Sequence, residues 1–262
     1  MENKIKYSIC GTVYNSAEII EKAVEPLLNL GNEFEIIITD NRSTDGTYEI
    51  LKKFLPKVKS ISLKCTRGLG RNKAIELAQG DIIVLIDFDV AYFNILDAVN
   101  YYENNNYKDY RLLVIPTKIF CNSYIIIGRK KLFDYLEGYP DLNNAEDVYF
   151  YRKAEALNVF KSVNLNLQYK CLEIKSKKSG QESRYEKNLF KLIIRRIKAT
   201  RDTIFVNNLN YKQLMEWYKL KSYIKMFYIG IPLYLSGKLL TYFIKVPKLE
   251  KEIERIKNKK FP

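Results

Sequence analysis

Two segments in which a run of apolar residues leads to an aspartate constrain the fold of this 262-residue chain most strongly. They are "FEIIITD" (34–40) and "DIIVLIDFDV" (81–90), and in the second five apolar residues run unbroken before Asp87 and Asp89. Such a run, rich in Ile and Val, is typical of a strand covered on both faces, as in a parallel sheet between helices. Ligands of these sheets bind beyond the carboxyl ends of the strands, so acids there can hold a hard cation such as Mg²⁺ or Mn²⁺. A turn that caps the next helix is the alternative interpretation.

Strand-like and helix-like segments alternate through the N-terminal half, which predicts an α/β fold with a mostly parallel, Rossmann-like sheet. A later strand, helix and turn fill 123–141, and a helix follows over 145–158. The other expected strands are 6–15, 34–40, 58–64, 82–87, 111–116 and 167–175, with helices at 17–30, 48–55, 69–79 and 94–105.

Charge divides the chain into two regions. Residues 1–150 carry 18 Lys and Arg against 21 Asp and Glu, a net charge of −3, whereas residues 151–262 carry 26 against 9, a net charge of +17. We therefore expect one domain over 1–180 and a basic helical region over 181–262, whose charge suits an anionic membrane surface or a nucleic acid. The run at 226–244 is interpreted as a helix or hairpin in the membrane interface; a spanning helix, a core helix or a dimer interface are the alternatives.

Composition excludes several kinds of site. The chain has no His, which rules out a Ser-His-Asp triad and a His-rich metal site. Its four cysteines are far apart in the sequence, which argues against a zinc ribbon or a disulfide framework and suits a reducing compartment. The charged N-terminal start does not resemble a secretory signal. We therefore expect a cytoplasmic protein, peripheral at the cytoplasmic face of the membrane.

Four motifs occur in an order that resembles the family 2 glycosyltransferases of the GT-A fold. They are "TVYN" (12–15), "IIITDNRSTDGT" (36–47), "RGLGRNKAIELAQGDIIVLIDFD" (67–89) and "GYPDLNNAEDVYFYRKA" (138–154). The resemblance covers roughly residues 5–160, and it implies an inverting transferase that uses a nucleotide sugar and a divalent metal, Mn²⁺ or Mg²⁺.

The resemblance implies roles for individual residues. Asp40 matches the position that hydrogen-bonds the nucleotide base. Asp87 and Asp89 match the DxD motif. Asp89 is implied to be the direct ligand of the metal, and Asp87 to contact both the metal and the donor. Asp147 matches the catalytic base, and the neighbouring Glu146 supports the site. The remaining donor-binding candidates are Thr12, Tyr14, Asn15 and Arg71, the last of which forms an Arg-Asn pair with Asn72.

The sequence departs from the family pattern in places. Asn41 and Arg42 stand where many relatives have Asp and Gly, and no His is present as a further metal ligand, so water or Glu146 would complete the metal shell. Gly68 and Gly70 resemble a dinucleotide-binding loop, but they do not follow the first strand. Asp40 could instead start a turn, and Glu146 and Asp147 could simply complement a helix dipole.

The chemistry of such a transfer suits these residue types. A metal held by carboxylates neutralises the charge that builds on a leaving diphosphate, and a base opposite it takes the proton of the acceptor hydroxyl. We expect a UDP-, GDP- or dTDP-sugar donor and a glycan or polyprenyl-lipid acceptor. Two alternatives remain: a sugar-nucleotide nucleotidyltransferase, and a nucleic-acid- or membrane-binding scaffold protein with a vestigial domain.

Overall fold

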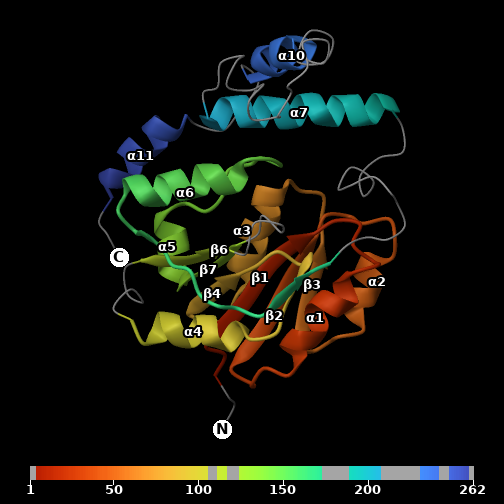
Figure 1. Ribbon diagram of the computed structural model, residues 1–262, viewed down its shortest axis with the longest axis vertical. Helices are drawn as coiled ribbons and strands as arrows, with labels where there is room; N and C mark the ends of the chain where they lie inside the picture. Colours follow the sequence, from red (N-terminus) through yellow and green to blue (C-terminus); the bar gives the residue numbers. More distant parts are fainter. Residues whose placement is uncertain are drawn as a thin grey trace.

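The computed structural model describes residues 4–105, 111–116, 124–172, 189–207, 231–241 and 248–259. Its centre is a seven-stranded sheet with the strand order β3-β2-β1-β4-β7-β6-β8 (Figure 1). Strands β3, β2, β1 and β4 run parallel to one another, β7 runs antiparallel to β4 and β6, and β8 is parallel to β6. The strands are β1 (Tyr7–Val13), β2 (Phe34–Asp40), β3 (Val58–Ser62), β4 (Ile82–Leu85), β6 (Leu112–Pro116), β7 (Tyr124–Arg129) and β8 (Phe160–Ser162).

Helices cover both faces of this sheet, which explains the continuous apolar runs. Side chains of alternate strand residues point to opposite faces. Ile36 and Val84 pack on one face against α1 (Ile20–Leu28), α2 (Thr47–Lys52) and α4 (Ile95–Glu103). Ile37 and Ile83 pack on the other face against α3 (Arg67–Leu77), α5 (Lys130–Tyr135) and α6 (Glu146–Ala156). The expected α/β class and mostly parallel sheet are thereby confirmed.

Two short strands were not predicted. One is β8; the other is β5 (Val90–Tyr92), which follows Asp89 directly and pairs antiparallel with β9 (Tyr169–Cys171). Three residues are too few to give a strand period, so pairing with a distant segment decides these elements. Of the strand expected at 167–175, residues 173–175 lie outside the described residues.

Three helices of the basic C-terminal region are described. They are α7 (Leu189–Asn207), α10 (Ile231–Thr241) and α11 (Leu249–Lys257). Figure 1 shows α10 lying on α7, and α11 lying beside α6. Within the described ranges, no helix combines the length and apolarity needed to cross a bilayer. Parts of the expected interfacial segment, 226–230 and 242–244, lie outside the described residues, and the division of the chain at residue 180 stays a prediction.

The structure corrects one expectation about the cysteines. Cys171 is disulfide-bonded, whereas Cys10 and Cys65 are free thiols. Sequence spacing led us to expect no disulfide, but spacing does not determine which thiols a fold brings within bonding distance.

Candidate active site

The carboxyl ends of three neighbouring strands carry the candidate residues. Because β2, β1 and β4 are parallel neighbours, their carboxyl ends meet at one edge of the sheet. Asp40 is the last residue of β2, Thr12 lies near the end of β1, and Asp87 and Asp89 follow β4. The sheet itself therefore gathers candidates that are far apart in the sequence.

Asp40 is fully buried, and its carboxylate shapes the loop that follows β2. It accepts hydrogen bonds from the Ser43 backbone amide at 3.1 Å and from the Ser62 hydroxyl at 2.7 Å. Ser62 lies directly opposite Asp40 in the register of β2 and β3. In this structure Asp40 thus organises the strand end, and its contact with a nucleotide base stays a prediction.

The loops after β1 and β2 are tied together beside Asp40. The Asn15 backbone amide donates to the Ser43 hydroxyl at 2.8 Å, and the Asn15 side-chain oxygen accepts from the Thr44 amide at 2.9 Å. Tyr14 precedes Asn15 and is partly exposed. Thr12 donates to the carbonyl oxygen of Thr39 at 2.9 Å. These contacts hold Tyr14 and Asn15 at the edge where a donor nucleotide is expected.

Arg71 connects the acids after β4 to the start of α6. Its guanidinium donates to Asp87 at 2.9 Å and to Glu146 at 2.5 Å. Arg71 and Glu146 are both buried, whereas about a third of the Asp87 side chain is exposed. Because a planar guanidinium presents its donors in a fixed fork, the distance between the two carboxylates is set by this one side chain. A donor contact of Arg71 stays a prediction.

The charges of this cluster depend on one another. Burial lowers the pKa of Arg71, but the carboxylates of Asp87 and Glu146 raise it by more, so the guanidinium stays charged. Asp147 also raises the pKa of Arg71, which indicates that Asp147 belongs to the same electrostatic cluster. Burial raises the pKa of Glu146, and Arg71 offsets this only in part. One oxygen of Glu146 has no hydrogen-bond partner among the described residues. This agrees with a raised pKa, because no hydrogen bond to that oxygen stabilises the charged carboxylate.

Asp147, the predicted base, lies in the first turn of α6. It is half-buried, and one of its oxygen atoms accepts from the Val148 amide at 2.8 Å. The preceding loop is anchored on α3, because the Gly68 amide donates to the Leu142 carbonyl oxygen at 3.1 Å. A Cβ at Gly68 would lie 1.9 Å from the Pro140 carbonyl oxygen, so only glycine allows this approach. Gly68 thus serves packing and not a dinucleotide.

The acids present fit a metal that is shared with a substrate. Within the parts of the chain that the structure describes, no three or more His, Cys, Asp or Glu side chains converge on a point where they could hold a cation. Mg²⁺ in phosphate-transferring sites is commonly held by one or two carboxylates, substrate phosphates and water. Asp87 and Asp89, both partly exposed beyond β4, match that donor set. Glu146 pairs with Arg71 through one oxygen, and its place in a metal shell stays a prediction.

Sequence reasoning missed several residues that hold this site. Ser62 could have been found, because it ends the strand next to Asp40. Tyr139 could not: its ring lies 5.3 Å from the Arg71 guanidinium and stacks on Phe150 at 4.2 Å, a contact set by the tertiary packing of α6.

Known proteins resemble this chain over part of its length. Residues 8–124 match the glycosyl transferase family 2. The poly(ribitol-phosphate) beta-glucosyltransferase of Bacillus spizizenii is 32% identical over 94 residues, which span 32% of this chain and 15% of that protein. The putative teichuronic acid biosynthesis glycosyltransferase TuaG of Bacillus subtilis is 34% identical over 88 residues, which span 31% of this chain and 35% of that protein. The matches thus span far less than two thirds of these relatives.

Solved structures extend the likeness in fold to almost the whole chain. Staphylococcus aureus TarS 1–349, solved in complex with UDP-GlcNAc, superposes with a TM-score of 0.60 at 18% identity, over 96% of this chain and 83% of that one. The mannosyltransferase PcManGT of Pyrobaculum calidifontis, solved with GDP-Man and Mn²⁺, gives a TM-score of 0.55 at 14% identity, over 89% and 73%. With the sheet and the acids beyond β4, these likenesses identify the fold as GT-A, and residues 8–124 are similar to the glycosyl transferase family 2.

Proposed function

We propose that this protein is an inverting glycosyltransferase that moves a sugar from a nucleoside-diphosphate sugar to a hydroxyl acceptor. The observation that carries the proposal is the bridge by Arg71, which ties Asp87 beyond β4 to Glu146 at the start of α6. Asp147 follows Glu146 directly, so the expected diphosphate side and the expected base belong to one site. The family match and the fold support the same reaction type.

In this proposal each acid has a separate task. Asp89, with Asp87, would hold a divalent cation, which when bound neutralises the charge on the leaving diphosphate. Asp147 takes the proton of the acceptor hydroxyl as it attacks the anomeric carbon, while the bond to the diphosphate breaks on the opposite face. A single displacement of this kind inverts the anomeric centre. Arg71 stays charged and holds Asp87 in place.

The donor is proposed as a UDP-, GDP- or dTDP-sugar, and the acceptor as a glycan or a polyprenyl-linked lipid. TarS was crystallised with UDP-GlcNAc and PcManGT with GDP-Man and Mn²⁺, which supports the donor class and a divalent metal. Two of the similar proteins are named as poly(ribitol-phosphate) transferases, which supports a polymeric glycan acceptor over a small molecule.

A donor hydrolysis screen tests the proposal. UDP-, GDP- and dTDP-sugars are incubated with the protein and Mn²⁺ or Mg²⁺, and release of the nucleoside diphosphate is measured. We expect turnover with one donor class, a requirement for the metal, and a loss of at least about 10²-fold in Asp89→Ala, because that variant lacks the proposed direct ligand. Unchanged turnover in Asp89→Ala would remove the metal role. Formation of a nucleoside triphosphate and a sugar 1-phosphate when pyrophosphate is added would favour the nucleotidyltransferase alternative, and salt-sensitive nucleic-acid binding without donor binding would favour a scaffold protein.

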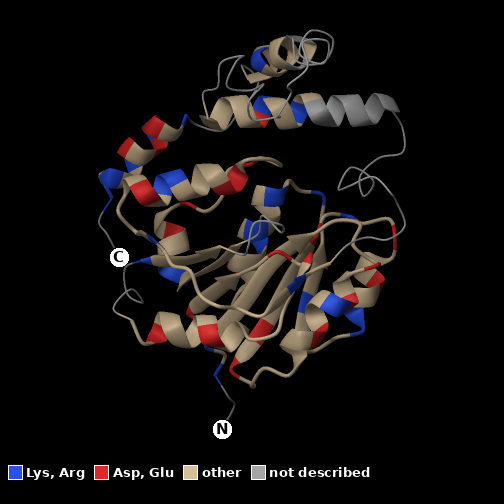
Figure 2. Ribbon diagram, viewed as in Figure 1, with Lys and Arg blue, Asp and Glu red and all other residues tan. Residues whose placement is uncertain are grey.

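We further propose that α10 places the enzyme on an anionic membrane at its cytoplasmic face. Gly237 of α10 packs against Thr200 of α7, whereas Leu235 and Leu239 are 60% and 64% exposed, one helical turn apart. Figure 2 shows α10 as largely uncharged, and Lys238 is its one charged residue. An apolar helix face beside basic residues is typical of interfacial binding, and anionic lipid gathers at the cytoplasmic leaflet.

Vesicle flotation checks this surface. We expect binding to phosphatidylglycerol vesicles, weaker binding to phosphatidylcholine, and a loss of about tenfold or more in Leu235→Asp/Leu239→Asp, because two apolar side chains no longer enter the interface. Leu77→Asp, an exposed leucine on α3, serves as the matched control and should bind as the wild type does. Equal binding by all three proteins would contradict the proposal.

A further inference from the structure

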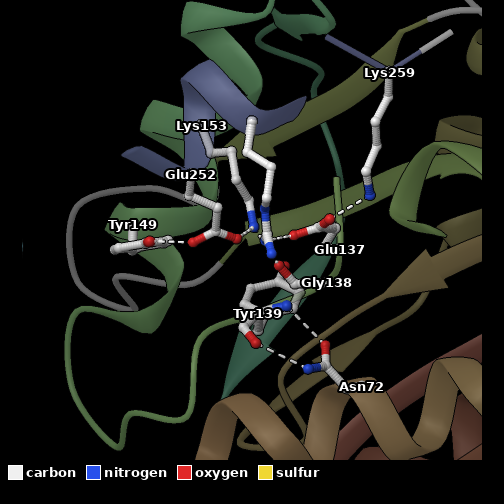
Figure 3. Close-up of polar contacts among 9 residues, drawn as sticks. Asn72, Glu137, Gly138, Tyr139, Tyr149, Lys153, Glu252 and Lys259 are labelled. Carbon is white, nitrogen blue, oxygen red and sulfur yellow. Dashed lines mark hydrogen bonds and ion pairs between the residues drawn. The ribbon is translucent and has the colours of Figure 1, made fainter. Parts of the chain in front are cut away.

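The C-terminal helix α11 is fastened to α6 through one buried carboxylate. Glu252 of α11 accepts from the Lys153 ammonium at 2.8 Å, and its second oxygen accepts from the Tyr149 hydroxyl. Lys153 and Tyr149 are both on α6, one helical turn apart, so they lie on the same helix face. Figure 3 shows the carboxylate between them. One residue of α11 thus holds two residues, one helical turn apart, of the helix that carries Asp147.

Lys153 also connects α6 to the turn before it and to α3. Its ammonium donates to the Gly138 carbonyl oxygen at 2.9 Å. The next residue, Tyr139, is held by both ends of the Asn72 amide: the Tyr139 amide donates to it at 2.8 Å, and it donates to the Tyr139 carbonyl oxygen at 2.9 Å (Figure 3). Asn72 follows Arg71 in α3. The contacts of Lys153 therefore lead back to the residue beside the guanidinium that bridges the site.

Asp147 lies between two fastenings of α6. Arg71 holds the helix at Glu146, one residue before Asp147, and Glu252 holds it at Tyr149 and Lys153, two and six residues after it. A rigid helix fixed at both sides leaves its first turn little freedom to tilt. Orientation of this kind matters to a base, because displacing a reacting group by about 1 Å can cost on the order of 10²-fold in rate.

Stability alone does not explain a buried ion pair here. Lys153 is fully buried and Glu252 is 7% exposed, and burial lowers the pKa of Lys153, which reflects the cost of desolvating its charge. Replacing a buried pair by apolar residues of similar volume is often neutral or stabilising. What apolar contacts lack is direction, since hydrogen bonds to charged groups fix both distance and angle.

We propose that Lys153 and Glu252 are positioning residues, which make α11 part of the catalytic apparatus by fixing the direction in which α6 presents Asp147. This inference rests on the proposed function, because Asp147 is the base only there. The basic C-terminal region accordingly has a role in the chemistry in addition to any role in docking.

The test compares Glu252→Gln with Arg255→Gln on the same helix. Arg255 pairs with Glu137 at the surface and is mostly exposed, so its loss leaves the contacts of Glu252 in place. For Glu252→Gln we expect kcat for transfer to fall by about 10- to 100-fold, with the KM for the donor within about twofold of the wild type. Amide hydrogen exchange over residues 144–150 should become faster. For Arg255→Gln we expect wild-type values of kcat and exchange.

A second variant covers the case in which Glu252→Gln does not fold. Lys153→Met/Glu252→Leu replaces both charges by apolar side chains of similar size, which preserves packing; the same fall in kcat is expected. Full activity and wild-type exchange in either folded variant would overturn the proposal, as would an equal fall in Arg255→Gln. If the wild type turned over no donor, the proposed function would fail. Hydrogen exchange in Glu252→Gln would still test whether Glu252 holds α6 in place: faster exchange over 144–150 supports this, and unchanged exchange overturns it.

Discussion

Replacing Asp147 by Asn is expected to lower kcat for transfer to a hydroxyl acceptor by about 10²- to 10⁴-fold, the usual contribution of a general base. The amide keeps the size of the carboxylate and can still accept from the Val148 amide, so the first turn of α6 stays in place. The KM for the donor should remain within about twofold, because the donor side of the site is built from other residues. Steady-state kinetics with each substrate varied in turn measure both values.

Asp141→Asn is the matched control for this change. Asp141 lies six residues earlier, is exposed, and accepts from the Thr66 hydroxyl at 2.8 Å; we expect near wild-type kcat. A loss of donor binding in Asp147→Asn as large as the loss of kcat would contradict the role of base. A phosphate acceptor has no proton to remove, so full activity of Asp147→Asn with such an acceptor would agree with proton transfer as the task of Asp147, and a loss of activity would indicate that Asp147 orients the acceptor.

Replacing Arg71 by Met is expected to lower the free energy of unfolding by about 3–5 kcal/mol at neutral pH, the typical cost of removing one partner of a buried ion pair. Met fills much of the space of the arginine stem, but the buried Glu146 loses its close ion pair and keeps only the longer contact with the partly exposed Arg67. Arg67→Met is the control: Arg67 lies 3.6 Å from the same carboxylate and is 43% exposed, and such pairs contribute about 1 kcal/mol or less. Urea unfolding followed by circular dichroism measures both.

The loss of unfolding free energy in Arg71→Met, called the deficit below, should depend on pH. Burial already raises the pKa of Glu146 above its ordinary value, and Arg71 opposes that shift, so its removal raises the pKa further. A carboxyl whose pKa is raised by folding favours the folded state below its unfolded pKa, and this advantage is lost as the pH rises through the folded pKa. The deficit should therefore be largest at pH 7 to 8 and should shrink as the pH falls toward 5. A deficit that does not change with pH would show that Glu146 is not its source.

Much of the sheet could be predicted because its strands are buried on both faces. The continuous apolar residues at 36–38 and 82–86 indicate this burial directly in the sequence, and β2 occupies the predicted range. The strands β5 and β8 could not be predicted, since each has three residues and exists only through pairing with β9 and β6. The antiparallel direction of β7 likewise depends on a connection that no local pattern encodes.

The candidate site divides in the same way. The positions of Asp40, Asp87 and Asp89 followed from the sequence, because acids at the ends of parallel strands must meet at one edge. The partner of Glu146 did not, since Arg71 lies 75 residues earlier and on another helix. The role of α11 was invisible as well: the helical period of "LEKEIERIK" places Glu252, which is buried, nearer than Glu254 to the apolar side of the helix, but it does not show that this side packs on α6.

The amino-acid sequence by itself determined the class of fold and the edge of the sheet at which chemistry is expected, because burial periodicity and strand-end acids are local properties of the chain. Only the tertiary structure decided which charges are paired: Arg71 with Asp87 and Glu146, and Lys153 with Glu252. The physical reason is that an ion pair depends on distance and desolvation in space, and neither is a function of separation along the sequence.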